Sequence, residues 1–256
     1  MPTSSMTLVI PALNEEKGIV ATLERVPATV AEVIVVDGGS KDRTAELARK
    51  AGARVIVENK RGYGLAYKHG FEAAKGDIIG TADADGTYPI ELLPHIAEFL
   101  RTRDLSFVNC SRFPLADAAS MHGLNRFGNV GLSLAASALY LHPFRDISSG
   151  MWVFRRDLLQ KLSLRDEGWC FSNEIKLEAY WTAPDEFAEF VIPYNERVGD
   201  THNVAIWATG VQVLTFMMRR RVEHFMRSRV VDQQRASRSD YVRPPRSGPP
   251  DDGARS

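Results

Sequence analysis

Apolar and polar positions alternate along the first half of the chain in the pattern of short buried strands followed by helices. Apolar runs cover residues 7–11, 33–36, 54–57 and 77–80, and helical periodicity follows, as at Thr44, Leu47 and Ala48. Such alternation is typical of βαβ units, whose strands pair in parallel. The pattern predicts an α/β fold with a mostly parallel central sheet and flanking helices.

Polar or acidic loops directly follow three of these predicted strands, at residues 11–15, 37–40 and 83–87. In the first loop Asn14 is predicted to cap a helix that carries Glu15 and Glu16 in its first turn. Ligands of parallel sheets bind beyond the carboxyl ends of the strands. We therefore expect the three loops to share one ligand-binding rim.

Two aspartates, Asp83 and Asp85, stand in the third loop with Gly86 and Pro89 bracketing a turn. Carboxylates with this spacing can bind Mg²⁺ or Mn²⁺ together with substrate phosphates. An acidic surface turn is the alternative, because a short motif of this kind is common. Asp37 is placed to accept a hydrogen bond from a ribose or a base. No Gly-x-Gly-x-x-Gly motif follows either early strand, so a dinucleotide site is not predicted.

The second half begins with a predicted strand over residues 105–110, and a glycine-punctuated apolar segment over 121–141 suits a mobile helix or lid. From 204 to 226 the pattern is that of an amphipathic helix. Its predicted apolar face consists of Trp207, Val211, Leu214, Met218, Val222 and Phe225. Such a helix suits a membrane interface, or it packs on the domain. The predicted organisation is a catalytic domain over 1–202, this helix over 203–231, and a disordered tail over 232–256.

Composition and charge bear on which partners and which cellular location are expected. The 32 basic and 32 acidic residues balance, so no attraction to nucleic acid is expected. Cys110 and Cys170 lack metal-ligand spacing and are predicted to be reduced and buried. The N-terminus has no signal-peptide pattern, and no apolar run of 18 residues occurs. We expect a cytoplasmic protein that touches a membrane only peripherally, on its cytoplasmic face.

Three segments together carry a specific resemblance. Residues 9–16 (VIPALNEE), 35–44 (VVDGGSKDRT) and 81–89 (TADADGTYP) occur in an order and spacing that resemble inverting family 2 glycosyltransferases of the GT-A fold. The most similar group is the polyprenyl-phosphate sugar synthases, such as dolichol-phosphate mannose synthases. The resemblance extends over about the first 200 residues.

The resemblance implies a role for each matching residue. The residues implied to bind the nucleotide-sugar are Pro11, Leu13, Glu15, Val35, Asp37, Asp83, Ala84 and Asp85. Asp83, Asp85 and Thr87 would lie on the metal side, and Arg112, Arg126 and Arg197 would contact phosphates. Ser149 and Glu174 would lie on the acceptor side, although Glu174 is equally well read as a structural hydrogen-bond acceptor. Leu13 replaces a frequent tyrosine and Thr87 a frequent glutamine.

The implied activity is metal-dependent transfer of a hexose from a nucleotide-sugar to a polyprenyl phosphate. GDP-mannose is the first donor expected, with UDP-glucose and UDP-N-acetylglucosamine as alternatives. A phosphate acceptor is already anionic and needs no general base, whereas a hydroxyl acceptor would need Glu174 or Asp146. The rival interpretations are a transferase with a hydroxyl acceptor and a non-catalytic nucleotide-sugar-binding subunit. An oligomer or a membrane-protein partner is compatible with all three.

Overall fold

The computed structural model describes residues 5–115, 123–198 and 206–240. All the predicted site residues lie within these ranges. Residues 203–205 of the predicted terminal helix, the side chain of Trp207 and tail residues 241–256 lie outside what is described.

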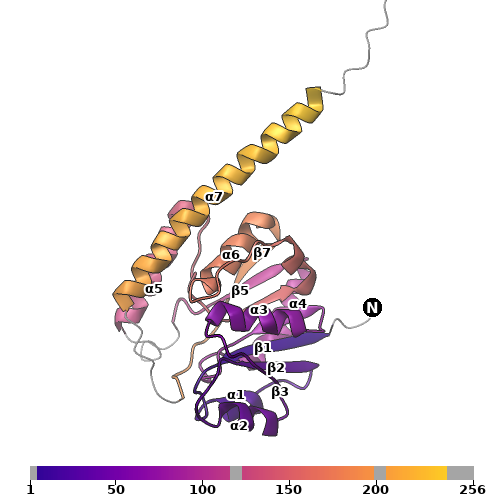
Figure 1. The fold of residues 1–256 in the computed structure, drawn as a ribbon, viewed down its shortest axis with the longest axis vertical. Helices are drawn as coiled ribbons and strands as arrows, with labels where there is room; N and C mark the ends of the chain where they lie inside the picture. The colour runs from indigo at the N-terminus through magenta and orange to yellow at the C-terminus, as the bar shows by residue number, and fades with distance from the viewer. Residues whose placement is uncertain (1–4, 116–122, 199–205, 241–256) are drawn as a thin grey trace, which may run out of the picture. The chain divides into compact units, whose positions relative to one another are not determined.

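A single seven-stranded sheet organises the chain (Figure 1), with the strand order β3-β2-β1-β4-β6-β5-β7. Its strands are β1 (Met6–Ala12), β2 (Glu32–Asp37), β3 (Arg54–Val57), β4 (Ile78–Thr81), β5 (Phe107–Ser111), β6 (Trp152–Arg155) and β7 (Phe187–Val191). Only β6 pairs antiparallel with its neighbours, so the predicted mostly parallel sheet is confirmed.

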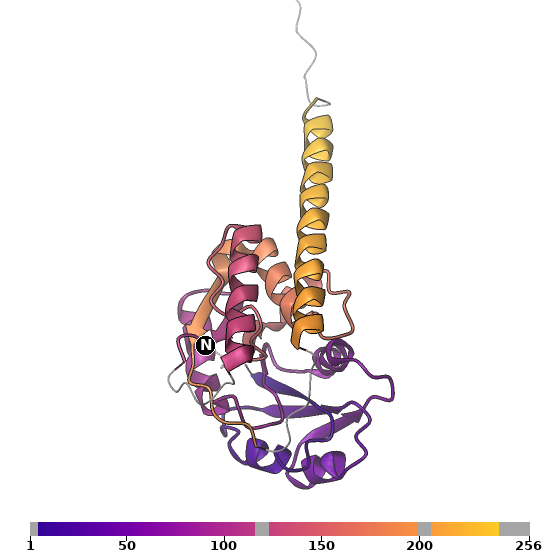
Figure 2. The same cartoon turned by 90° about the vertical axis from the view of Figure 1, so that its left-hand side faces the viewer.

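Helices and short 3₁₀ turns connect the strands. The α-helices are α1 (Ile19–Glu24), α2 (Thr44–Lys50), α3 (Tyr63–Ala73), α4 (Leu93–Thr102), α5 (Gly123–Tyr140), α6 (Phe171–Thr182) and α7 (Ile206–Asp240). The 3₁₀ turns are η1 (Ile90–Leu92), η3 (Arg156–Lys161) and η4 (Pro184–Glu186). Figures 1 and 2 show helices α1 to α4 and α6 around the sheet.

Two hydrophobic clusters form on opposite faces of the sheet, because successive side chains of a strand point to opposite sides. In β1, Leu8 and Ile10 join the cluster that includes residues of α1, α2 and α4. Val9 joins the cluster that includes residues of α3, α5 and α6. Each fully buried aliphatic side chain stabilises the fold by about 1.5–3 kcal/mol. The sheet is therefore covered on both faces, which explains the continuous apolar runs of its strands.

The strand order reverses beside β1, which pairs with β2 on one side and with β4 on the other. The carboxyl ends of β1, β2, β4 and β5 lie at the same edge, and the antiparallel β6 begins there. Crevices at such a reversal are the usual ligand sites of α/β sheets. The predicted common rim therefore exists.

The predicted helix cap at Asn14 is wrong. Asn14 has a positive φ of 54°, and α1 begins only at Ile19. The backbone N–H of Asn14 donates to Ser40 Oγ at 2.8 Å, and its side-chain Oδ1 accepts from the Lys41 N–H at 2.8 Å. Asn14 thus ties the first polar loop to the second. Glu15 and Glu16 lie in the turn before the helix, and Glu15 contacts Arg197 there.

The terminal helix also differs from the prediction. α7 is continuous to Asp240, past the predicted end at 231 (Figure 1). By internal contacts the chain divides into a unit of residues 1–218 and a second of 219–256, and the predicted domain boundary at 202 stays a prediction. Within the first unit, Val213 and Met217 are buried in the second hydrophobic cluster, whereas Val211 and Leu214 are exposed. Part of the predicted apolar face is therefore open to solvent.

Candidate active site

Arg197 lies between two rim carboxylates. Its Nη1 is 2.6 Å from Asp85 Oδ2, and its Nη2 contacts Glu15 Oε1. Asp85 is almost fully buried, and its Oδ1 accepts from the backbone N–H and the hydroxyl of Thr87 at 3.1 and 2.6 Å. Backbone bonds from Asn195 to Thr87 and from Val198 to Asp85 fasten the loop that carries Arg197. The structure therefore brings three predicted site residues into one ionic cluster, with Thr87 orienting Asp85.

Asp83 is the second carboxylate of the pair. Its Oδ1 accepts from the Tyr63 hydroxyl at 3.3 Å. Burial, and then the charge of Asp85, raise the pKa of Asp83 above its usual value. A Cβ atom at Gly150 would lie 3.1 Å from Asp83 Oδ2, closer than most side chains tolerate. Only glycine fits this close approach of backbone to carboxylate comfortably.

Asp37 ends β2 and is buried on the nucleotide side of the predicted rim. Its Oδ2 accepts from the Ser40 N–H at 3.1 Å. Its buried Oδ1 has no hydrogen-bond partner among the residues that the structure describes. A buried acceptor without a partner is costly, so a donor group of a ligand would fit here. Leu13, in the loop beside it, is 36% exposed and offers an apolar surface, and Pro11 is half-buried.

Two of the residues implied to bind the nucleotide lie in the core. Val35 is fully buried in the first hydrophobic cluster, and Ala84 is nearly so. The Val35 side chain therefore packs in the core beneath the rim, and its implied contact with the nucleotide stays a prediction. Ala84 uses its carbonyl to accept from Thr22 Oγ1 at 3.0 Å.

Arg112 forms a buried ion pair with Asp146. Its Nε and Nη2 lie 2.6 and 2.8 Å from the two carboxylate oxygens, and its backbone N–H donates to Oδ2 at 3.0 Å. The guanidinium also lies 5.2 Å from the centre of the Tyr194 ring. This bidentate geometry orients Arg112 rigidly at the end of β5. Both carboxylate oxygens of Asp146 thus bind Arg112.

Arg126 lies exposed near the start of α5. Among the described residues, no hydrogen bond or ion pair joins Arg126 to the rim carboxylates or to Arg112, so its phosphate role stays a prediction. Glu174, on α6, accepts through Oε2 from the backbone N–H groups of Arg165 and Asp166 at 2.9 and 2.8 Å. These bonds fit the interpretation of Glu174 as a structural hydrogen-bond acceptor, and its role on the acceptor side stays a prediction.

The segment at Ser149, which the resemblance implies to lie on the acceptor side, is held by residues that the sequence does not single out. The Ser149 carbonyl accepts from Trp152 Nε1 at 2.8 Å, from Ser172 Oγ at 3.0 Å and from Lys176 Nζ at 2.5 Å. Lys176 is fully buried. The only sequence signal for it is a lysine between Ile175 and Leu177, in a helix where polar and apolar residues occur equally often.

A divalent cation fits the donor set at the rim. Asp83 and Asp85 supply hard oxygen ligands, the type that Mg²⁺ and Mn²⁺ prefer. Arg197 already neutralises Asp85 and Glu15, which shows that this cluster needs positive charge. In the described part of the chain, no group of three or more His, Cys, Asp or Glu is arranged to hold a metal by itself. Substrate phosphate oxygens would therefore have to complete the coordination.

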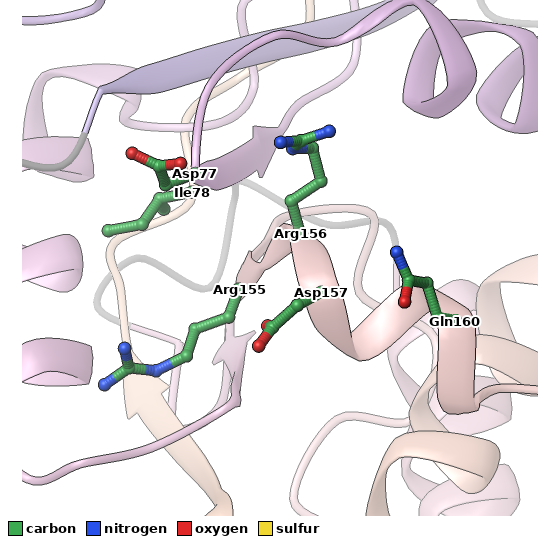
Figure 3. Close-up of a pocket in the computed structure, with 6 residues that line it drawn as sticks. All are labelled: Asp77, Ile78, Arg155, Arg156, Asp157 and Gln160. Carbon is green, nitrogen blue, oxygen red and sulfur yellow. The ribbon is translucent and has the colours of Figure 1, made fainter.

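A polar hollow exists at the opposite edge of the sheet, where β4 begins and β6 ends (Figure 3). It is lined by Asp77, Ile78, Arg155, Arg156, Asp157 and Gln160. Figure 3 shows the guanidinium groups of Arg155 and Arg156 pointing in different directions. Arg155 is bonded to the Leu105 carbonyl and to Asp104. The hollow contains none of the predicted site residues.

The part of the chain that matches a known protein family contains the three segments of residues 9–16, 35–44 and 81–89. Residues 7–163 match the model of glycosyl transferase family 2. A dolichyl-phosphate hexose transferase of Haloferax volcanii is 36% identical over 199 residues, which cover 77% of this chain and 85% of that protein. A dolichyl-phosphate beta-glucosyltransferase of Trichomonas vaginalis, ALG5C, is 28% identical over 222 residues, which cover 76% of this chain and 65% of that protein.

Solved structures confirm the fold. Glucosyl-3-phosphoglycerate synthase from Mycobacterium tuberculosis, in complex with Mn²⁺, UDP and phosphoglyceric acid, superposes with a TM-score of 0.69. The match covers 85% of this chain and 78% of that one, at 23% identity. The predicted GT-A architecture is thereby confirmed.

Proposed function

The chain belongs to glycosyl transferase family 2, and from this premise we propose that it transfers a hexose from a nucleotide-sugar to a polyprenyl phosphate with inversion at the anomeric carbon. The names of the Haloferax and Trichomonas relatives support a lipid-phosphate acceptor. The observation that carries the proposal is the rim itself. Asp83 and Asp85 lie there with the guanidinium of Arg197 beside Asp85, and Arg112 lies at the end of β5, which supports binding of a metal diphosphate and of anionic substrates.

The chemistry that we propose is a single displacement. An oxygen of the acceptor phosphate forms a bond to the anomeric carbon while the bond from that carbon to the nucleoside diphosphate breaks. A cation held by Asp83 and Asp85 would supply positive charge to the departing diphosphate. Arg197, released from the carboxylates, would add a second positive group there. The remaining work of the protein is to align donor and acceptor.

The interactions that Asp146 and Glu174 already make favour a phosphate acceptor over a hydroxyl acceptor. A hydroxyl must lose a proton to a nearby base as it attacks. Asp146 is occupied by the guanidinium of Arg112, and Glu174 binds backbone N–H groups of residues 165 and 166. Both of the bases named for a hydroxyl acceptor are therefore already engaged within the protein. A phosphate acceptor needs none.

Access to a polyprenyl phosphate requires contact with a membrane. Over the described residues, no helix is long and apolar enough to cross one. We propose peripheral contact through an exposed face of α5, where Phe127, Val130 and Leu134 recur at helical spacing with Arg126 beside them. Phe127 and Leu134 are 76% and 66% exposed. Contact with the cytoplasmic face stays a prediction.

A donor panel tests the proposal. Purified protein, Mg²⁺ or Mn²⁺ and a short-chain polyprenyl phosphate are incubated with GDP-mannose, UDP-glucose or UDP-N-acetylglucosamine, and the sugar is followed into the lipid phase. Transfer from one donor identifies both reaction and sugar. The variant Asp85→Ala should abolish transfer while the fold persists, and Asp157→Ala, an exposed aspartate at the opposite edge of the sheet, is its matched control.

Other results of the panel contradict the proposal in distinguishable ways. Transfer only to added saccharide hydroxyls would replace the lipid-phosphate acceptor by a hydroxyl acceptor. Nucleotide-sugar binding without transfer to any acceptor would indicate a binding subunit. Full activity of Asp85→Ala would remove the metal assignment.

A further inference from the structure

One face of α6 presents three buried polar side chains to the loop of residues 146–150. Asn173 Nδ2 donates to the Ile147 carbonyl at 3.0 Å. Ser172 Oγ and Lys176 Nζ both donate to the Ser149 carbonyl, and Lys176 also donates to Ser172 Oγ at 3.1 Å. The ammonium group lies 5.3 Å from the centre of the Trp152 ring. The helix thus holds the loop by its backbone oxygens.

Both ends of this loop serve the active site. At one end, Asp146 forms the bidentate pair with Arg112. At the other, the Gly150 N–H donates to the Tyr88 hydroxyl at 2.6 Å, and the Gly150 carbonyl accepts from Thr81 Oγ1 at 3.0 Å. The α-carbon of Gly150 packs against the Asp83 carboxylate. A shift of the Ser149 carbonyl would therefore move the partner of Arg112 and the seat of Asp83 together.

A lysine is an expensive choice for this position. Lysine is rarely fully buried, and burial of its charge is costly without a partner. Burial lowers the pKa of Lys176 to about 7, against the opposing influence of Asp146. Arg112 lowers the pKa further, and the charges of Glu189 and Asp83 raise it. An apolar side chain would fill the core at less cost, so the amine needs a reason beyond packing.

We propose that Lys176 is a positioning residue for hexosyl transfer, which fixes the Ser149 carbonyl and through it keeps Asp146 and Gly150 in register with Arg112 and Asp83. It acts from behind the site, since its side chain is fully buried. The inference rests on the proposed function only for the choice of acceptor.

The test compares Lys176→Met, which keeps length but removes donor and charge, with Lys176→Gln, which keeps a neutral donor. Lys161→Met, an exposed lysine on η3, is the matched control. Hydrogen exchange is followed in a peptide that covers residues 146–151, with a β1–β2 peptide as internal reference. In parallel, kcat and KM for donor and polyprenyl phosphate are measured from pH 6 to 9.

Lys176→Met should exchange the 146–151 amides about tenfold faster while the β1–β2 amides stay protected. Its kcat should fall about tenfold or more, with the KM for the nucleotide-sugar nearly unchanged, because misplaced reacting groups lose rate more than binding. If the kcat of the wild type changes near pH 7 because Lys176 gains or loses a proton, the kcat of Lys176→Met should not change there. Lys176→Gln should recover part of both losses.

Either unchanged loop exchange or a kcat within twofold of wild type in Lys176→Met would overturn the proposal. If that variant does not fold, Ser172→Ala removes a donor to the same carbonyl and decides by the same two readouts. A wild-type protein that does not glycosylate polyprenyl phosphate would refute the proposed function, and loop exchange would still decide the role of Lys176.

Discussion

The Nη1 atom of Arg197 lies 2.6 Å from Asp85 Oδ2, on a carboxylate that the family resemblance assigns to a metal ion. The same guanidinium reaches Glu15. Arginine therefore supplies the positive charge that these carboxylates require in the free protein. A bound cation and Arg197 should compete for Asp85, and a bound diphosphate would offer Arg197 an alternative anionic partner.

Replacing Arg197 should separate metal binding from turnover. In Arg197→Met we expect Mn²⁺ to bind the nucleotide-free protein more tightly, by about tenfold, because no guanidinium has to leave Asp85. Turnover should fall, since the diphosphate loses a positive group. Mn²⁺ titration followed by electron paramagnetic resonance measures the first effect. Arg49→Met, an exposed arginine on α2, is the control. Weaker Mn²⁺ binding in Arg197→Met would contradict the competition.

Asp37 should recognise the nucleoside through its buried Oδ1. Asp37→Asn can keep the bond from the Ser40 N–H through its amide oxygen, but it replaces the second oxygen by a donor. We expect the affinity for the nucleoside diphosphate to fall about tenfold, the cost of a mismatched buried hydrogen bond. Calorimetry with UDP and GDP measures it. Equal affinities of wild type and variant would exclude this contact.

Asp146 should be required for stability as well as for the orientation of Arg112. Asp146→Ala leaves a buried guanidinium without its partner, which typically costs about 3–5 kcal/mol of unfolding free energy. The double variant Asp146→Ala with Arg112→Met removes the uncompensated charge and should regain part of that loss. Urea unfolding of the wild type and the three variants completes the cycle. Additive losses in the double variant would show that the pair is not coupled.

Lys176 should make stability depend on pH. Its pKa is about 7 in the folded protein and about 10.5 when the chain is unfolded. Between these values the unfolded chain binds a proton that the folded protein does not, so unfolding free energy rises with pH. The unfolding free energy of the wild type should rise relative to that of Lys176→Met by about 1.4 kcal/mol per pH unit near pH 8–9. Urea unfolding at pH 7, 8 and 9 measures this difference. Parallel pH curves for the two proteins would contradict a lowered pKa.

The sequence by itself determined the fold class and the composition of the rim. Strand periodicity is a local property, and the predicted strand at residues 54–57 coincides with β3. The carboxyl-end rule then places Asp37, Asp83 and Asp85 together without knowledge of contacts. Local reasoning failed at Asn14, because bonds to Ser40 and Lys41 in another loop hold its positive φ.

Only the tertiary structure decided how the charges are paired. Arg197 is 112 residues from Asp85 and 182 from Glu15, and Arg112 is 34 from Asp146. No periodicity connects positions so far apart. Lys176 shows the same limit, because its buried amine donates to the Ser149 carbonyl, which is 27 residues away in the sequence. The pattern of a strand depends on residues that are adjacent in the sequence. The orientation of a buried charge depends on which distant groups the completed fold brings to it.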